Sequence, residues 1–377
     1  MSGDGAELLA RATWSALVEP GDTVAGTLVG LLGAAEALEW VHAAVRDRPD
    51  LARLEDRTGP LSDADRRRVV KALARWAVRL PGCDPRRDLA QHDRLGGALL
   101  VPGDPRWPSA FDDLGVEAPF SVWVRGEPDL GATLALSAAV VGSRAATTYG
   151  ERIAFDLADG LSADGVCVVS GGAYGIDAAA HRGAVARGGR TVVVLAGGVD
   201  RAYPAGNARL LDAVVDSGGA LVSEVPPGSL PTKSRFLQRN RLIAAAGRAT
   251  VVVEAAWRSG AMSTAHHAAR LLRPVGAVPG PVTSMASAGC HRLLREGVAV
   301  CVTDAAEVRE LAGVIGSSLV AAASATRTAD ERAARRHDAL DPVSARVLDA
   351  LSRRVPVELQ KARRKELRVR GGEELPG

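Results

Sequence analysis

The chain has 377 residues, of which 47% are hydrophobic and 24% charged, and its formal net charge is +3. This composition is typical of a soluble globular protein with room for more than one domain. No apolar run reaches the roughly 18 residues of a membrane span. Asp4 and Glu7 precede any apolar stretch, which argues against a signal peptide. Four scattered cysteines without a CxxC pair indicate neither a zinc site nor disulfides. We therefore expect a reduced, cytoplasmic protein.

Nearly all of the positive charge is arginine, because lysine occurs only at positions 71, 233, 361 and 365. The planar guanidinium suits phosphate and also stacks on a nucleobase. A GC-rich genome produces the same bias everywhere in a chain. The positions of the arginines, rather than their number, therefore have to carry the argument.

Residues 1–80 show helical periodicity and no strand signal. Apolar residues recur there at three- and four-residue steps. Ser62, followed by Asp65, opens a helix that runs through Trp76. We predict a small N-terminal helical domain over 1–80. Residues 81–133 are rich in Pro, Gly and Asp, with short strand-like runs at 99–101 and 122–124, and are interpreted as a connector that packs on the next domain.

From Leu134 on, short aliphatic runs alternate with segments long enough for crossover helices. Continuous rather than alternating apolar strands indicate a parallel sheet covered on both faces. The predicted domain spans 134–315, and ligands of such sheets bind outside the carboxyl ends of the strands. The expected strands are 134–141, 166–170, 191–196, 220–223, 250–254, 275–280 and 299–302.

Residues 316–377 are predicted to form a linker and a truncated, winged-helix-like tail. The segment contains a charged run, a short helix over Pro342–Leu351 and a basic end. The residues after Asp341 are too few for a complete winged helix, and no wing-like strand pair is evident.

Three glycine-rich loops follow predicted strands and lead into helices, where backbone amides favour an anion. Thr147 or Thr148 is expected to cap the first of these helices. Such loops also occur for packing alone, but an arginine among them favours a phosphate-bearing ligand. The candidate residues are Gly142, Ser143 and Arg144; Ser170, Gly171, Gly172, Tyr174 and Gly175; and Ser259, Gly260 and Thr264.

The basic segment 225–253 contains no acid. Helical spacing places Arg239 on the same face as Arg235, while Arg241 points elsewhere. Phe236 lies among these basic side chains. Basic and aromatic side chains that alternate in this way are what single-strand binding requires. A solvated basic helix with Phe236 in the core explains the pattern equally well on charge alone. The five bases are Lys233, Arg235, Arg239, Arg241 and Arg248.

Other patterns argue against several enzyme classes. The chain lacks a GxGxxG opening, a P-loop and a G-x-S-x-G elbow. Asp177 and His181 lie four apart on one helix, but without a third ligand a metal site is disfavoured. Asp177 is expected to cap the loop amides and His181 to pack on the sheet. No convincing nucleophile and base are present.

With these residues established, the chain resembles the DprA/Smf family of bacterial DNA-processing proteins. The resemblance covers the sheet domain almost from end to end and extends more loosely to the N-terminal helices. The matching runs are VVGSRAATTYG (140–150), SGGAYGIDAAAHRGA (170–184), AGGVDRAYPAGN (196–207), SEVPPG (223–228), FLQRNRLIAA (236–245), EAAWRSGAMSTA (254–265) and VPGPVTSMASAGCHRLLREGV (278–298).

The resemblance implies an α/β protein with an extended Rossmann-like, doubly wound, mostly parallel sheet, a SAM-like helical N-terminus and a short C-terminal helical appendage. It also implies a protein that binds single-stranded DNA, loads the RecA recombinase onto it and protects incoming DNA in natural transformation and recombination. Such a protein forms homodimers, catalyses no reaction and uses no cofactor or metal.

Carried over by position, the resemblance places the DNA contacts on the loop residues above and on the basic segment. Arg144, Lys233, Arg239 and Arg241 are expected to meet phosphates. Where many relatives carry a base before the GID run, this chain has Tyr174, so a ring replaces a charge. Phe236 and Tyr174 are the candidates for base stacking. Arg235 and Asn240 complete the expected nucleic-acid-binding set.

Two alternatives remain. A nucleotide-processing, phosphoribohydrolase-like enzyme would hold a nucleoside monophosphate at the same edge and use Glu254 as its carboxylate. Against it, the PGGxGT run of that group is absent, and the corresponding turn is RSGAMST. A purely structural scaffold would show no nucleic-acid affinity at low salt.

Overall fold

The computed structural model describes residues 3–47 and 49–313. The predicted tail, 316–377, lies outside the described residues. Within the described part, no single helix is long and apolar enough to cross a membrane. Helices α2 (Thr23–Leu32) and α3 (Ala34–Arg46) pass that test of length and composition only as a pair joined across a 115° bend.

The predicted N-terminal helices are confirmed. Trp14 and Trp76 meet edge to face at the centre of this region, with ring centroids 5.6 Å apart, and the Trp14 indole donates to the Ala34 carbonyl. Ser62 caps α5 by accepting from the Asp65 amide, as predicted. Besides α2 and α3, the helices are α1 (Gly3–Leu17), α4 (Ala52–Thr58) and α5 (Asp63–Arg79).

The remaining chain builds one nine-stranded sheet, with strand order β1-β2-β6-β5-β4-β3-β7-β8-β9. Strands β3 to β9 run parallel, and β1 and β2 are antiparallel to their neighbours. The strands are β1 (Ala98–Leu100), β2 (Val122–Gly126), β3 (Ser137–Val141), β4 (Cys167–Ser170), β5 (Thr191–Leu195), β6 (Ala220–Ser223), β7 (Ala249–Val252), β8 (Val275–Ala277) and β9 (Val300–Cys301).

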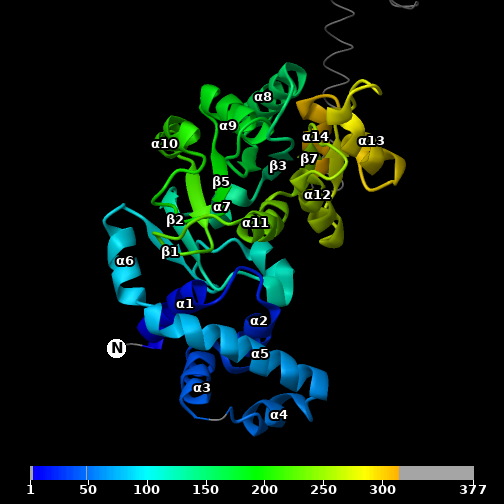
Figure 1. Cartoon of the computed structure of the whole chain (residues 1–377). Coiled ribbons are helices and arrows are strands. Elements are labelled where there is room, and N and C mark those ends of the chain that lie inside the picture. The colour runs from blue at the N-terminus through cyan, green and yellow to red at the C-terminus, as the bar shows by residue number, and fades with distance from the viewer. Residues whose placement is uncertain (1–2, 48, 314–377) are drawn as a thin grey trace, which may run out of the picture. The chain divides into compact units, whose positions relative to one another are not determined.

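Helices cover both faces of this sheet. Since successive strand residues point to opposite sides, neighbouring residues of one strand pack against different helices. Val140 packs with the residues of α8 and α9, whereas the neighbouring Val141 packs with those of α11 and α12. Figure 1 shows these two helix layers on either side of the strands. The helices of this part are α6 (Pro85–Asp93), α7 (Leu130–Leu134), α8 (Thr148–Ala163), α9 (Ile176–Ala186), α10 (Ala208–Asp216), α11 (Lys233–Ala246), α12 (Gly260–Arg270), α13 (Ala288–Arg295) and α14 (Ala305–Ala312). The 3-10 helices are η1 (Leu80–Gly82), η2 (Ser109–Glu117), η3 (Ala205–Asn207) and η4 (Met285–Ser287).

Two expected boundaries differ from the structure. The expected strand beginning at Leu134 begins at Ser137, because Asp129 caps the short helix α7, whose Leu130 and Leu134 are buried. The predicted connector supplies β1 and β2, so the sheet begins at residue 98 rather than 134.

The sheet changes its winding direction between β3 and β7, which are neighbours in space although three strands separate them in sequence. At such a switch point, loops diverge to opposite faces and leave room for ligands beyond the carboxyl ends of the strands. The loops after β3, β4, β5 and β7 meet along this edge, and α11 lies beside them.

Candidate nucleic-acid interface

The centre of the candidate site is the ring of Phe236, in the first turns of α11. The guanidinium carbon of Arg144, from the loop after β3, lies 4.4 Å from the ring centroid. The guanidinium carbon of Arg239, from the next turn of α11, lies 5.8 Å from it. Two predicted bases and the predicted aromatic residue are thus brought together from segments about 90 residues apart in the sequence. The quadrupole of the ring favours cations over its face.

Arg239 is buried beneath the glycine loop rather than exposed to solvent. Its Nη1 donates to the Val194 carbonyl at 2.6 Å, and a Cβ added at Gly171 would collide with this nitrogen. Burial lowers the pKa of Arg239 to about 10; Asp177 opposes the shift, and Arg144 adds to it. The side chain is therefore still a cation at neutral pH. It supplies positive potential under the loop and supports Phe236 without reaching the surface.

The loop Ser170–Gly175 uses two of its amides internally. Gly171 and Ala173 both donate to Asp177 Oδ2, at 3.2 and 3.4 Å, which confirms the predicted cap. Burial raises the pKa of Asp177, although Arg239 and these amides oppose the rise. Gly175 has φ +75° and packs against the Ser143 carbonyl, where a side chain would collide. Gly172 also has a positive φ, and Ser170 donates to the Val140 carbonyl.

His181 behaves as predicted and packs against the sheet. Its Nδ1 lies 2.8 Å from the Thr191 hydroxyl, and burial lowers its pKa to about 3, so it is neutral at physiological pH. No group of three or more metal-ligating side chains occurs among the described residues.

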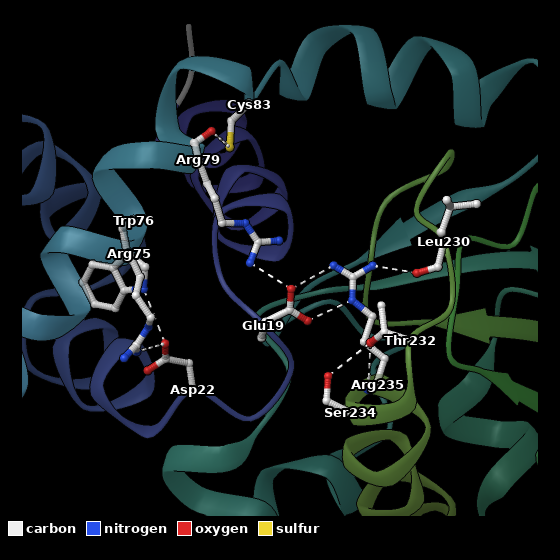
Figure 2. Close-up of polar contacts among 10 residues, drawn as sticks. All are labelled: Glu19, Asp22, Arg75, Trp76, Arg79, Cys83, Leu230, Thr232, Ser234 and Arg235. Atoms are coloured by element: carbon white, nitrogen blue, oxygen red, sulfur yellow. Dashed lines mark hydrogen bonds and ion pairs between the residues drawn. The ribbon is translucent and has the colours of Figure 1, made fainter.

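Arg235 is held by the N-terminal helical region. Its Nε and Nη2 donate to the two carboxylate oxygens of Glu19 at 2.8 and 3.0 Å, and Arg79 from α5 donates to the same carboxylate (Figure 2). Partial burial alone would raise the pKa of Glu19, but the hydrogen bonds and charges of Arg235 and Arg79 together outweigh it and the pKa is lowered. A predicted DNA contact is therefore neutralised by a carboxylate 216 residues away in the sequence.

Arg241 is enclosed in the protein interior. Its side chain has no exposed surface and forms a bidentate ion pair with Glu224 at 2.6 and 2.7 Å, while its Nε donates to the Glu117 carbonyl. The expectation that Arg241 points away from Arg239 is correct. The expected phosphate contact has to be revised, because this guanidinium has no surface to offer a phosphate.

The remaining predicted residues fall into exposed and structural groups. Lys233, at the start of α11, and Tyr174 are exposed, and no ion pair of Lys233 is found among the described residues. Asn240 donates to the Gly260 carbonyl and joins α11 to α12. Ser259 caps α12 through the Ala261 amide. Thr264 is buried, whereas Gly142 and Ser143 are partly exposed beside Arg144.

Of the basic segment, Lys233 and Arg248 are the exposed charges that no described acid neutralises. Arg248 donates to the carbonyls of Ala312 and Ala135. Outside the segment, Arg144 is exposed and has no ion pair among residues 3–47 and 49–313. Because segment 225–253 contains no acid, its sequence indicates more free positive charge than the fold leaves. The acids that pair with it, Glu224 and Glu19, come from outside the segment.

The switch-point crevice holds a separate cavity of about 570 Å³. Its lining includes Thr147, Tyr149 and Glu254, together with residues 279–281 and 284. Glu254 is buried, and its oxygens accept from the Thr147 amide and hydroxyl at 2.9 and 2.5 Å. Thr147 also caps α8, as predicted. The carboxylate that the enzyme alternative needs is thus engaged in holding a helix terminus.

Sequence reasoning did not single out Tyr203, Glu19 or Glu224. Tyr203 lies in the loop after β5, and its ring centroid is 5.7 Å from that of Phe236. Its aromatic character within a loop at the carboxyl edge was an available signal. The two acids gave none, since their partners are defined only by the fold.

The fold and this edge define a doubly wound α/β protein whose carboxyl edge gathers basic and aromatic side chains. The model of the family described as DNA recombination-mediator protein A matches residues 98–313, and the chain belongs to this family. Its members process DNA or mediate recombination, which gives the general role of this chain.

Individual relatives agree. A Mycobacterium tuberculosis protein assigned to DprA is 49% identical over 284 residues, covering 71% of this chain and 72% of its own. The crystal structure of DprA from Streptococcus pneumoniae has a TM-score of 0.59 and 30% identity, covering 79% of this chain and 94% of its own. A Helicobacter pylori DprA, studied for its single-stranded DNA binding mode, has a TM-score of 0.51 and 28% identity, covering 57% and 94%.

Proposed function

We propose that this protein binds single-stranded DNA along the edge formed by the loops after β3, β4 and β5 and the start of α11. The observation that carries the proposal is the arrangement around Phe236, where Arg144 and Arg239 meet one ring from different segments. Two cations held close together repel each other, and a phosphate placed beside them relieves that repulsion. Exposed Lys233 extends the positive surface along α11.

The predicted contacts divide by this geometry. Arg144 and Lys233 meet phosphates directly, and Arg239 acts from beneath the loop through its charge. The glycine loop offers the amides that Asp177 does not occupy. With two or three phosphates neutralised, log K is expected to fall with log salt with a slope of about −1.5 to −2, at roughly 0.7 per contact for single strands.

The test is a salt titration of a fluorescent oligothymidylate, followed by anisotropy, with the matched duplex in parallel. Arg144→Ala/Lys233→Ala is expected to lose most of the affinity and most of the slope while keeping the wild-type unfolding temperature. The matched control is Arg67→Ala/Lys71→Ala, which removes the same two charges from exposed positions of α5. If the first double variant bound as tightly as the control, this site would be abandoned.

We further propose that the bound strand is delivered to the RecA recombinase in recombination and natural transformation, and that the protein acts by binding rather than by catalysing a reaction. Support comes from the family and from the buried, engaged state of Glu254. The measurement is RecA filament assembly on an oligonucleotide already covered by a single-strand-binding protein. Acceleration by the wild type but not by Arg144→Ala/Lys233→Ala is expected. Incubation with nucleoside monophosphates should release no free base.

Self-association into a homodimer is also proposed. Among the described residues, the short strand β9 ends the sheet and leaves Val300 exposed, and Leu272, just before the neighbouring β8, has 93% of its surface exposed. Apolar side chains at an unpaired sheet edge are stabilised by a second copy. Light scattering coupled to size exclusion measures the mass directly, and a monomer at micromolar concentration would contradict this part of the proposal.

A further inference from the structure

Two exposed side chains lie against the ring of Phe236. Arg144 lies over the ring at 4.4 Å, and Tyr203 lies 5.7 Å from it at an interplanar angle of 52°. Tyr203 is 49% exposed, whereas Phe236 is only partly exposed. A nucleobase approaching this cluster therefore meets Tyr203 and the outer face of Arg144 before it meets Phe236.

We infer that Tyr203 is a base-stacking residue of this site and that Phe236 serves mainly as the support on which Tyr203 and Arg144 rest. The inference rests on the proposed single-stranded DNA binding and extends it. Aromatic rings and arginine planes both accept stacked bases, and such stacking is independent of sequence because every base has a π-face. Paired bases of a duplex have no free face, so this contact also selects single strands over duplex.

The loop that carries Tyr203 is fixed on both sides. Asn207 Nδ2 donates to the carbonyls of Gly172 and Ala173 at 2.9 and 3.3 Å, which ties it to the glycine loop. Asp200 Oδ1 accepts from the Gly228 amide at 2.8 Å, which ties it to the segment before α11. A ring held in this way loses little conformational entropy when a base stacks on it.

Charges suited to the flanking phosphates are present in the same loop and on the Phe236 ring. Arg201, two residues before Tyr203, is exposed and makes no ion pair among residues 3–47 and 49–313. Arg144, whose guanidinium carbon lies 4.4 Å from the Phe236 ring centroid, is likewise exposed and has no ion pair among the described residues. In this arrangement nucleobases stack on the aromatic rings, and phosphates pair with the arginines and Lys233. Single-strand binding proteins use the same combination of contacts.

The experiment separates stacking from charge by measuring affinity and salt slope together. Tyr203→Leu is expected to weaken oligothymidylate binding about 5- to 150-fold, the range for losing one stacked base, with an unchanged salt slope. Tyr203→Phe keeps the ring and should stay close to wild type. Lys233→Ala should instead reduce the magnitude of the slope by about 0.7. Tyr149→Leu, at an exposed tyrosine of the separate cavity, is the matched control and should change neither quantity.

An abasic oligonucleotide of the same length sharpens the test, because it keeps the phosphates and removes the bases. Tyr203→Leu should bind it as the wild type does. Equal losses on abasic and normal strands, or wild-type affinity of Tyr203→Leu for normal strands, would overturn the stacking role. A wild-type protein without affinity for either strand would instead overturn the proposed function, and this inference with it.

Discussion

Replacement of Arg241 by methionine is expected to destabilise the protein without removing its DNA-binding surface. Arg241 offers its Nη atoms to both oxygens of Glu224 and its Nε to the Glu117 carbonyl, and it is fully buried. Arg241→Met has a similar length but no charge. It leaves a nearly buried carboxylate and a backbone carbonyl without their donors.

The magnitude follows from burial. Removing one partner of a buried pair costs about 3–5 kcal/mol, because the other charge is left uncompensated. At 2–4 °C per kcal/mol in domains of 150–250 residues, the unfolding temperature should fall by about 6–20 °C. Arg241→Met/Glu224→Leu removes both charges and should recover most of the loss, since apolar groups of similar volume often replace such pairs at little cost.

The assays are thermal unfolding for the unfolding temperature and denaturant unfolding for the free energy, on the two variants and the wild type. Oligothymidylate binding is measured well below the lowest transition. Affinity of folded Arg241→Met should stay within about threefold of wild type. Wild-type stability together with a large loss of affinity would refute the reasoning, because it would make Arg241 a DNA contact rather than a buried partner of Glu224.

Three further outcomes are expected. Glu19→Gln should cost at most about 1 kcal/mol, because the Glu19 side chain is 49% exposed. It should also raise DNA affinity a few-fold, because Arg235 loses the carboxylate that neutralises it; unfolding measures the stability and anisotropy the affinity. His181 has a folded pKa of about 3 against about 6.5 when unfolded. The unfolded state then binds more protons below pH 6.5, so the free energy of unfolding falls as the pH is lowered, by roughly 2–3 kcal/mol at pH 4.5. His181→Gln should reduce this difference between unfolding curves measured at pH 7 and at pH 4.5. Gly171→Ala should push Arg239 from its position and weaken both stability and binding, whereas an unperturbed variant would contradict the close packing seen there.

The parallel sheet could be predicted because its strands are buried on both faces. Runs such as TVVVLA do not alternate between polar and apolar residues. Such an uninterrupted apolar strand indicates a sheet with helices on both faces. The antiparallel strands β1 and β2 were recognised only as strand-like runs. The pairing of β2 with β6 depends on contacts about 100 residues away, for example Trp123 opposite Ser223, and local pattern does not encode such a register.

The sequence predicted which residues lie at the candidate site better than it predicted what each of them does there. Glycine, arginine and aromatic residues at strand ends mark the edge, and Arg144, Lys233 and Phe236 lie along it. Which arginines remain free is decided elsewhere. Glu19 removes Arg235 from the free set, Glu224 removes Arg241, and burial confines Arg239. Each outcome depends on a partner that no spacing rule reaches, so the basic segment looked more exposed in sequence than it is in the fold.

Two other buried carboxylates, those of Asp177 and Glu254, bear on which kind of phosphate this edge can bind. A nucleotide held as a cofactor needs the amides of a glycine loop or of a helix start, where the dipole favours an anion. Here Asp177 already accepts from the Gly171 and Ala173 amides, and Glu254 accepts from the Thr147 amide before α8. A nucleotide phosphate would have to displace a buried carboxylate, with the desolvation and repulsion that this entails. A DNA strand needs no such displacement, because Arg144 and Lys233 lie outside the loop. The glycine loop that resembles a nucleotide cradle in sequence therefore works better as the wall of an open, charged surface.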